Sequence, residues 1–158
     1  MDLANLVQRR RIHYYGNPRS DSDATNVNTR QKHHLPDGSL LAAIDLGSNS
    51  FHLVITKIEH GEIRPVEALA EKVQLGAGLE HGILDQSAID RGLECLGRFA
   101  QILESIEPEK IRAVGTNALR IAKNRRAFTA PAEKLLGTNI DVIYGREEAR
   151  LVYLGVAH

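Results

Sequence analysis

The sequence predicts an α/β domain with a mixed sheet and the element order β-β-β-α-β-α-β-α. Three observations lead to this prediction. Residues 40–73 contain three apolar or alternating runs of strand length, separated by short turns. Residues 86–105 carry apolar side chains at steps of three and four, as one face of a helix does. After residue 108, two short apolar runs each precede a helical pattern.

The first three strands are expected at 40–46, 51–58 and 62–73. The dipeptide His60-Gly61 between the second and third runs predicts a tight hairpin turn. Pro65 interrupts the third run and cannot donate a ladder hydrogen bond. The middle of this strand is therefore expected to bulge or to lie at an edge of the sheet.

The long helix at 86–105 is expected to begin after Asp85, a good N-cap residue, and to end at Glu107-Pro108. The remaining elements alternate between strands and helices. They are a strand at 111–114, a helical start at 118–124, a helix at 126–136 in which Pro131 marks a break or a new start, a strand at 140–144 and a helix at 146–154.

Residues 1–38 are polar and contain few apolar side chains to offset the entropy of ordering, so they are expected to be a disordered extension. The folded domain is then 39–158. The 20 basic and 20 acidic residues balance, and no global basic field points to a nucleic acid partner. The single cysteine, Cys95, is expected in the core and fits a reducing, cytoplasmic compartment. No apolar run is long enough for a transmembrane segment.

Three polar loops, at 47–50, 115–117 and 145–148, follow the carboxyl ends of predicted strands. Open α/β sheets bind ligands at that edge, so the three loops are expected to share one cleft. The first loop, with Asp45 before it, fits a phosphate-binding turn with a metal-organising carboxylate. It fits equally well an ordinary hairpin turn, in which Gly, Ser, Asn and Asp are common.

Charged residues near the other two loops also leave alternatives open. Glu147 and Glu148 suit the first turn of any helix, and one of them could instead act as a general base for water attack on a phosphoanhydride. Helical periodicity does not separate the two. Arg120 is either a solvated helix residue or a bidentate phosphate ligand. A basic cluster follows it, made of Lys123, Arg125 and Arg126.

Three blocks of sequence, at 43–54, 113–124 and 145–156, resemble in order three motifs of the exopolyphosphatase and guanosine pentaphosphate phosphohydrolase family. The resemblance spans about residues 40–158. It implies the ribonuclease H-like half of the fold shared by actin, heat-shock protein 70 and the sugar kinases. It also implies a Mg²⁺-dependent hydrolase that removes terminal phosphate from inorganic polyphosphate, with guanosine pentaphosphate as the alternative substrate.

The resemblance assigns roles to individual residues. Asp45 would help to organise the metal and the water, and Glu148 would be the catalytic base, which decides between the two glutamates. The first phosphate loop would be formed by Gly47, Ser48, Asn49 and Ser50. The phosphate path would be lined by Thr116, Asn117 and Arg120.

The chain departs from the family pattern in one respect. The family's second phosphate motif, of the Asp-Ile-Gly-Gly-Gly-Ser type, does not occur before His158. The chain is therefore expected to be truncated, with one wall of the cleft and weak or no activity alone. A dimer or a partner chain would cover the open half-cleft. The alternative to a hydrolase is a non-enzymatic remnant that binds polyphosphate or guanosine tetraphosphate, and a sugar kinase fits less well.

Overall fold

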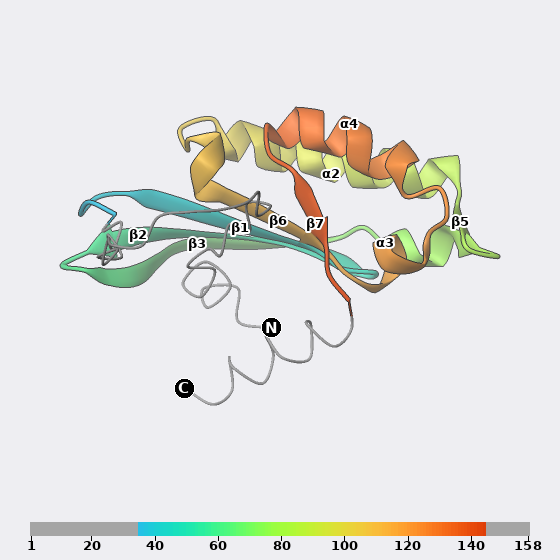
Figure 1. The fold of residues 1–158 in the computed structure, drawn as a ribbon, viewed down its shortest axis with the longest axis horizontal. Helices are drawn as coiled ribbons and strands as arrows, with labels where there is room; N and C mark the ends of the chain where they lie inside the picture. Colours follow the sequence, from blue (N-terminus) through green and yellow to red (C-terminus); the bar gives the residue numbers. More distant parts are fainter. Residues whose placement is uncertain (1–34, 145–158) are drawn as a thin grey trace, which may run out of the picture.

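The computed structural model describes residues 35–144, and Figure 1 shows how they are arranged. A five-stranded sheet in the order β3-β2-β1-β6-β7 forms one layer, and helices α2 and α4 lie together over one of its faces. The first three strands are antiparallel neighbours, and β1, β6 and β7 run parallel. The prediction of an α/β domain with a mixed sheet is confirmed.

The first three strands are β1 (Leu40–Leu46), β2 (Ser50–Glu59) and β3 (Glu62–Lys72), each close to its predicted bounds. His60 and Gly61 join β2 to β3 with positive φ angles of 53° and 77°, as a two-residue hairpin turn requires. The pairing of β2 with β3 shifts register where β2 faces Pro65, and β3 is an edge strand. Both expectations for the third strand, a bulge and an edge position, are confirmed.

A short element that the sequence did not predict follows β3. It consists of a 3₁₀ turn η1 (Leu75–Gly78) and a small hairpin of β4 (Leu79–Glu80) and β5 (Ile83–Leu84). Asn124 holds this hairpin, because its side-chain amide accepts from Leu84 N–H and donates to Leu84 C=O, both at 2.9 Å. The hairpin and the chain after α3 (Asn117–Ile121) therefore lie together at one end of the molecule (Figure 1).

Helix α2 (Gln86–Leu103) begins as predicted, since Asp85 Oδ1 accepts from Ala88 N–H at 2.6 Å. A 3₁₀ turn η2 (Pro108–Lys110), β6 (Ile111–Gly115), α4 (Arg126–Leu136) and β7 (Ile140–Val142) follow. The break expected at Pro131 is wrong, because α4 is continuous. Phe128 before the proline and Ala132 after it are both fully buried, so packing holds the two halves of α4 in line.

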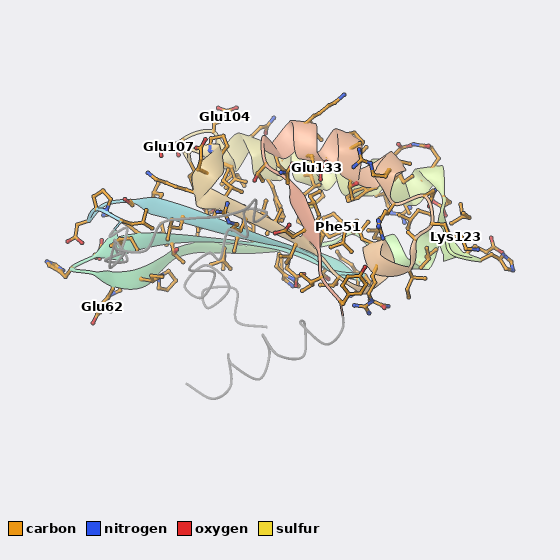
Figure 2. The ribbon with its side chains drawn as sticks, in the orientation of Figure 1. Phe51, Glu62, Glu104, Glu107, Lys123 and Glu133 are labelled. Carbon is orange, nitrogen blue, oxygen red and sulfur yellow. The ribbon has the colours of Figure 1, made fainter. Side chains whose placement is uncertain are left out.

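The main core lies between the sheet and the two helices. Alternate residues of the strands point to this side, and one of them is Phe51 of β2 (Figure 2). Its ring centroid lies 6.0 Å from that of Phe128 in α4. Burial of each such side chain is worth about 1.5–3 kcal/mol. The opposite face of the sheet carries a smaller cluster of Ala43, Val114 and Ile143, with Val54 against it.

Cys95 lies in the core on α2 with 1% of its surface exposed, as predicted. Burial, and next the nearby Glu71 carboxylate, raise the pKa of its thiol to about 12, so it stays protonated at neutral pH. No helix in the described part of the chain is long and apolar enough to cross a membrane. The predicted helix at 146–154 and residues 1–34 of the predicted extension lie outside the described residues.

Candidate functional site

The carboxyl ends of β1, β6 and β7 lie side by side, because these three strands are adjacent and parallel. Thr116 N–H donates to Leu46 C=O at 3.3 Å, which continues the β1–β6 ladder past the strand ends. Ala118 N–H, in the first turn of α3, donates to Ser48 Oγ at 3.1 Å. The structure therefore brings the first two predicted loops together. The loop at 145–148 lies outside the described residues.

The turn between β1 and β2, residues 47–49, is called here the first turn. Gly47 is required in it, because a Cβ atom at that position would lie 2.7 Å from the backbone oxygen of Ser50. The backbone oxygens of Ser48 and Asn49 face the segment after β3. Ser48 C=O accepts from Gly76 N–H at 2.8 Å, and Asn49 C=O accepts from the N–H groups of residues 73 and 74 at 3.1 and 2.8 Å.

The first turn, the segment after β3 and the start of α3 surround a hollow of about 290 Å³. Three of its lining residues carry side-chain amides: Asn49, Gln74 and Asn117. The rest of the lining consists of Ser48, Gly76, Ala77, Leu79 and Ala118. Amide N–H and hydroxyl groups are hydrogen-bond donors suited to phosphate oxygens.

Arg120 does not line the hollow but contacts Asn117, which does. Its guanidinium donates to Asn117 Oδ1 at 2.8 Å and to Ile143 C=O at 3.4 Å. Because Asn117 Oδ1 accepts from Arg120, the donor end of the Asn117 amide is left for the hollow. The arginine thus orients a neutral donor and places a positive charge one side chain away from the site.

The other predicted site residues occupy different places. Thr116 is 5% exposed and lies below the surface of the site. Ser50 does not line the hollow, and its Oγ accepts a long hydrogen bond of 3.4 Å from the Asn49 amide. The basic cluster at 123, 125 and 126 is exposed and does not line it either; Lys123 lies at the end of the molecule that carries β5 (Figure 2). Glu148 lies outside the described residues.

Asp45 lies on the face of the sheet that the helices do not cover. Its Cα partners are His52 in β2 and Val114 in β6, and Val114 belongs to the smaller cluster on that face. The carboxylate is 4.0 Å from His52 Nδ1, and the Asp45 side chain is 11% exposed. Among residues 35–144 no group of three His, Cys, Asp or Glu side chains could hold a metal ion. Asp45 supplies one carboxylate at the carboxyl end of β1.

The sequence did not predict the contribution of Gln74, Gly76 and Ala77. A signal was available, because β2 and β3 form a hairpin of nearly equal arms. Such a hairpin returns the chain to the point where β2 began, and Ser50 accordingly pairs with Lys72. The residues just after β3 must then lie beside the first turn.

A model of the Ppx/GppA phosphatase family matches residues 54–158, about two thirds of the chain. The chain belongs to the Ppx/GppA phosphatase family. It is 45% identical over 133 residues to a guanosine-5'-triphosphate,3'-diphosphate pyrophosphatase of Pseudoalteromonas atlantica, covering 84% of this chain and 26% of that protein. It is 48% identical over 120 residues to a protein of the same name from Aliivibrio fischeri, covering 75% and 24%. The chain thus spans about a quarter of the length of these relatives.

Solved structures of the Ppx/GppA family share the fold. The Aquifex aeolicus family member is 30% identical, with a TM-score of 0.67 over 75% of this chain and 39% of that one. An exopolyphosphatase from Cytophaga hutchinsonii is 31% identical, with a TM-score of 0.70 over 75% of this chain and 38% of that one. The family and the fold class inferred from the sequence are both confirmed.

Proposed function

We propose that this chain forms the first phosphate-binding wall of a hydrolase that removes a terminal phosphate from guanosine pentaphosphate. The observation that carries the proposal is the hollow at the carboxyl ends of β1 and β6, lined by one hydroxyl and three amide side chains. It lies where open α/β sheets bind their ligands. Membership of a phosphatase family favours phosphate as the ligand.

Guanosine pentaphosphate is the first candidate substrate because of the names of the relatives. The two pyrophosphatases are 45% and 48% identical to this chain, whereas the exopolyphosphatase from Cytophaga hutchinsonii is 31% identical. Inorganic polyphosphate remains the second candidate, supported by that exopolyphosphatase. Both substrates end in a phosphoanhydride, so the same donors would serve either.

In the proposed site Ser48, Asn49 and Asn117 donate to phosphate oxygens, and Arg120 orients Asn117. Mg²⁺ is often held in proteins by one or two carboxylates, with water and substrate phosphates completing its shell, and the single carboxylate of Asp45 fits that pattern. When bound, Mg²⁺ would offset the charge that develops on the phosphate. Asp45 would hold and orient water beside the first turn. The role of Glu148 as general base is proposed from the family resemblance.

Fast hydrolysis is proposed to need a second wall, supplied by another part of the protein or by a partner chain. One wall can bind phosphate, but it positions water and leaving group together poorly, so we expect this chain alone to release phosphate slowly. A cytoplasmic location is proposed as well, because the only cysteine is a buried free thiol.

The experiment measures binding and hydrolysis on the full 158-residue chain. Calorimetric titration with guanosine pentaphosphate and with tripolyphosphate, each with Mg²⁺, gives two affinities, and we expect the nucleotide to bind more tightly. Phosphate release is then compared between Glu148→Gln and the adjacent Glu147→Gln. We expect release, however slow, to be lost in Glu148→Gln and retained in Glu147→Gln.

Three outcomes would contradict parts of the proposal. Binding without any release in the wild type would favour the non-enzymatic remnant. Equal loss of release in both glutamate variants would remove the assignment of the base. If neither phosphate compound binds, the hollow is not a phosphate site.

A further inference from the structure

Gln74 has an unusual backbone conformation, with φ 54° and ψ 46° in the left-handed region. Non-glycine residues adopt it seldom, and usually in tight turns. His60 and His81 also have positive φ, but each precedes a glycine with positive φ in a two-residue turn. Gln74 precedes Leu75, which is fully buried in the core. A strained residue outside a two-residue turn suggests a functional constraint.

Hydrogen bonds fix the two peptide groups on either side of this residue. The N–H groups of Val73 and Gln74 donate to Asn49 C=O at 3.1 and 2.8 Å. Their C=O groups accept from Arg91, through Nε at 3.1 Å and through the guanidinium NH₂ at 3.4 Å. The guanidinium is itself oriented, because it donates to Ser87 Oγ at 2.8 Å.

The side chain of Gln74 is not used in this arrangement. It is exposed, it lines the hollow, and it makes no hydrogen bond to another residue within 35–144. A flexible side chain thus rises from a backbone that is fixed on both sides. The other two amides of the lining, Asn49 and Asn117, come from different loops, so the three reach the hollow from three segments.

We propose that Gln74 is a phosphate ligand of the hollow and that Arg91 is the residue that positions it. The inference rests on the proposed function, since it assumes that the hollow binds phosphate. Asn49 C=O accepts from the N–H groups of Val73 and Gln74. Arg91 donates to both C=O groups, and Gln74 C=O also accepts from Ala77 N–H at 3.1 Å. The Gln74 amide is thereby presented to the same anion as Ser48 and Asn117.

The decisive variant is Gln74→Gly. Glycine adopts the left-handed conformation without strain, so the loop and the fold are retained while the amide is removed. Binding of tripolyphosphate is measured by calorimetric titration, and stability by urea unfolding. We expect affinity to fall about three- to tenfold, the loss of one hydrogen bond, with no loss of stability. Gln101→Ala, which removes an exposed amide from the far part of α2, is the control and should bind like the wild type.

The positioning role is tested by Arg91→Gln. Arg98→Gln is its matched control, because Arg98 lies two turns further along α2 and pairs with the carboxylates of Glu71 and Glu94. We expect Arg91→Gln to weaken binding several-fold and Arg91→Lys to restore part of it. In the Gln74→Gly background, Arg91→Gln should weaken binding little further, since it acts through Gln74.

The outcomes separate the two proposals. If the wild type does not bind tripolyphosphate, the proposed function fails and the role of Gln74 falls with it. If the wild type binds and Gln74→Gly binds equally well, only the inference about Gln74 is overturned. If the losses from Arg91→Gln and Gln74→Gly simply add, Arg91 does not act through Gln74.

Discussion

The two turns at the ends of β2 each contain a glycine, but their backbone polar groups make different kinds of hydrogen bond. In the turn between β2 and β3, the N–H groups of His60 and Gly61 donate to the carboxylate of Asp37, at 2.8 and 3.1 Å. The chain thus supplies its own anion to two successive backbone donors. This turn is closed by a residue that precedes β1.

At the other end of β2, the backbone C=O groups of the first turn accept the hydrogen bonds. The C=O groups of Ser48 and Asn49 bind the segment after β3, while both side chains line the hollow. Composition does not distinguish the two turns, because both contain residues that favour turns. The difference is that one turn binds an internal carboxylate and the other presents side-chain donors to a hollow of about 290 Å³.

The strongest test of this difference is Gly47→Ala in the first turn. The added Cβ would lie 2.7 Å from the backbone oxygen of Ser50, so the turn must move. We expect the free energy of unfolding to fall by about 1–3 kcal/mol, and binding of tripolyphosphate to weaken at least tenfold. In Gly97→Ala, where the new Cβ meets nothing within 4 Å, stability should rise by about 0.5–1 kcal/mol with binding unchanged. Wild-type binding by Gly47→Ala would show that the geometry of the turn is not needed.

Removal of the Asp37 carboxylate tests the turn between β2 and β3. Asp37→Ala leaves the N–H groups of His60 and Gly61 to water, and we expect the free energy of unfolding to fall by about 1 kcal/mol, since the site is exposed. Tripolyphosphate affinity should not change, because the two turns lie at opposite ends of β2. Urea unfolding and calorimetry measure the two quantities. If Asp37→Ala changed tripolyphosphate affinity but not the free energy of unfolding, the turn at His60 and Gly61 would serve phosphate binding, contrary to this assignment.

A smaller effect is expected within the first turn itself. Ser48→Ala removes the acceptor of Ala118 N–H and a donor that lines the hollow. We expect about 0.5–1 kcal/mol less stability and a several-fold weaker affinity for tripolyphosphate. Ser50→Ala is the comparison, because Ser50 is the serine of this stretch that does not line the hollow. If Ser50→Ala weakens binding more than Ser48→Ala, the phosphate lies on the other side of the turn.

The strands, the N-cap Asp85 and the hairpin turn at His60 could be predicted because their signals are local. Alternation, turn residues and capping depend on a few neighbouring positions. The sequence similarly indicated that the loops after β1 and β6 meet, since parallel strands bring their carboxyl ends to one edge. The contacts of Ser48 and Asn117 with the hollow follow from that rule.

The remaining features depend on contacts between distant segments. Gln74 reaches the hollow because β3 returns beside the first turn, and Asp37 closes a turn 23 residues away. The residues of β1 before Asp45 are all apolar, so the sequence did not show which of them face each side of the sheet. It therefore did not indicate that Asp45 lies on the face away from the helices. Pro131 was expected to break α4, but buried neighbours on both sides hold the helix together.

The smallest expected effect concerns a third pairing, remote from both turns, in which Arg98 holds Glu71 of β3 against α2. The hydrogen bond from Arg98 keeps the pKa of Glu71 below its ordinary value of 4.5. A lowered carboxylate pKa stabilises the fold at pH values above the ordinary pKa, and this contribution is lost as pH falls through the folded-state value. Arg98→Gln should therefore reduce stability slightly near pH 7, and the difference from wild type should shrink below about pH 4. Urea unfolding at both pH values measures it. If the difference in the free energy of unfolding does not shrink in acid, Arg98 acts through packing rather than through charge. If Arg98→Gln changes tripolyphosphate affinity near pH 7, the pairing of Arg98 with Glu71 affects the first turn through β3.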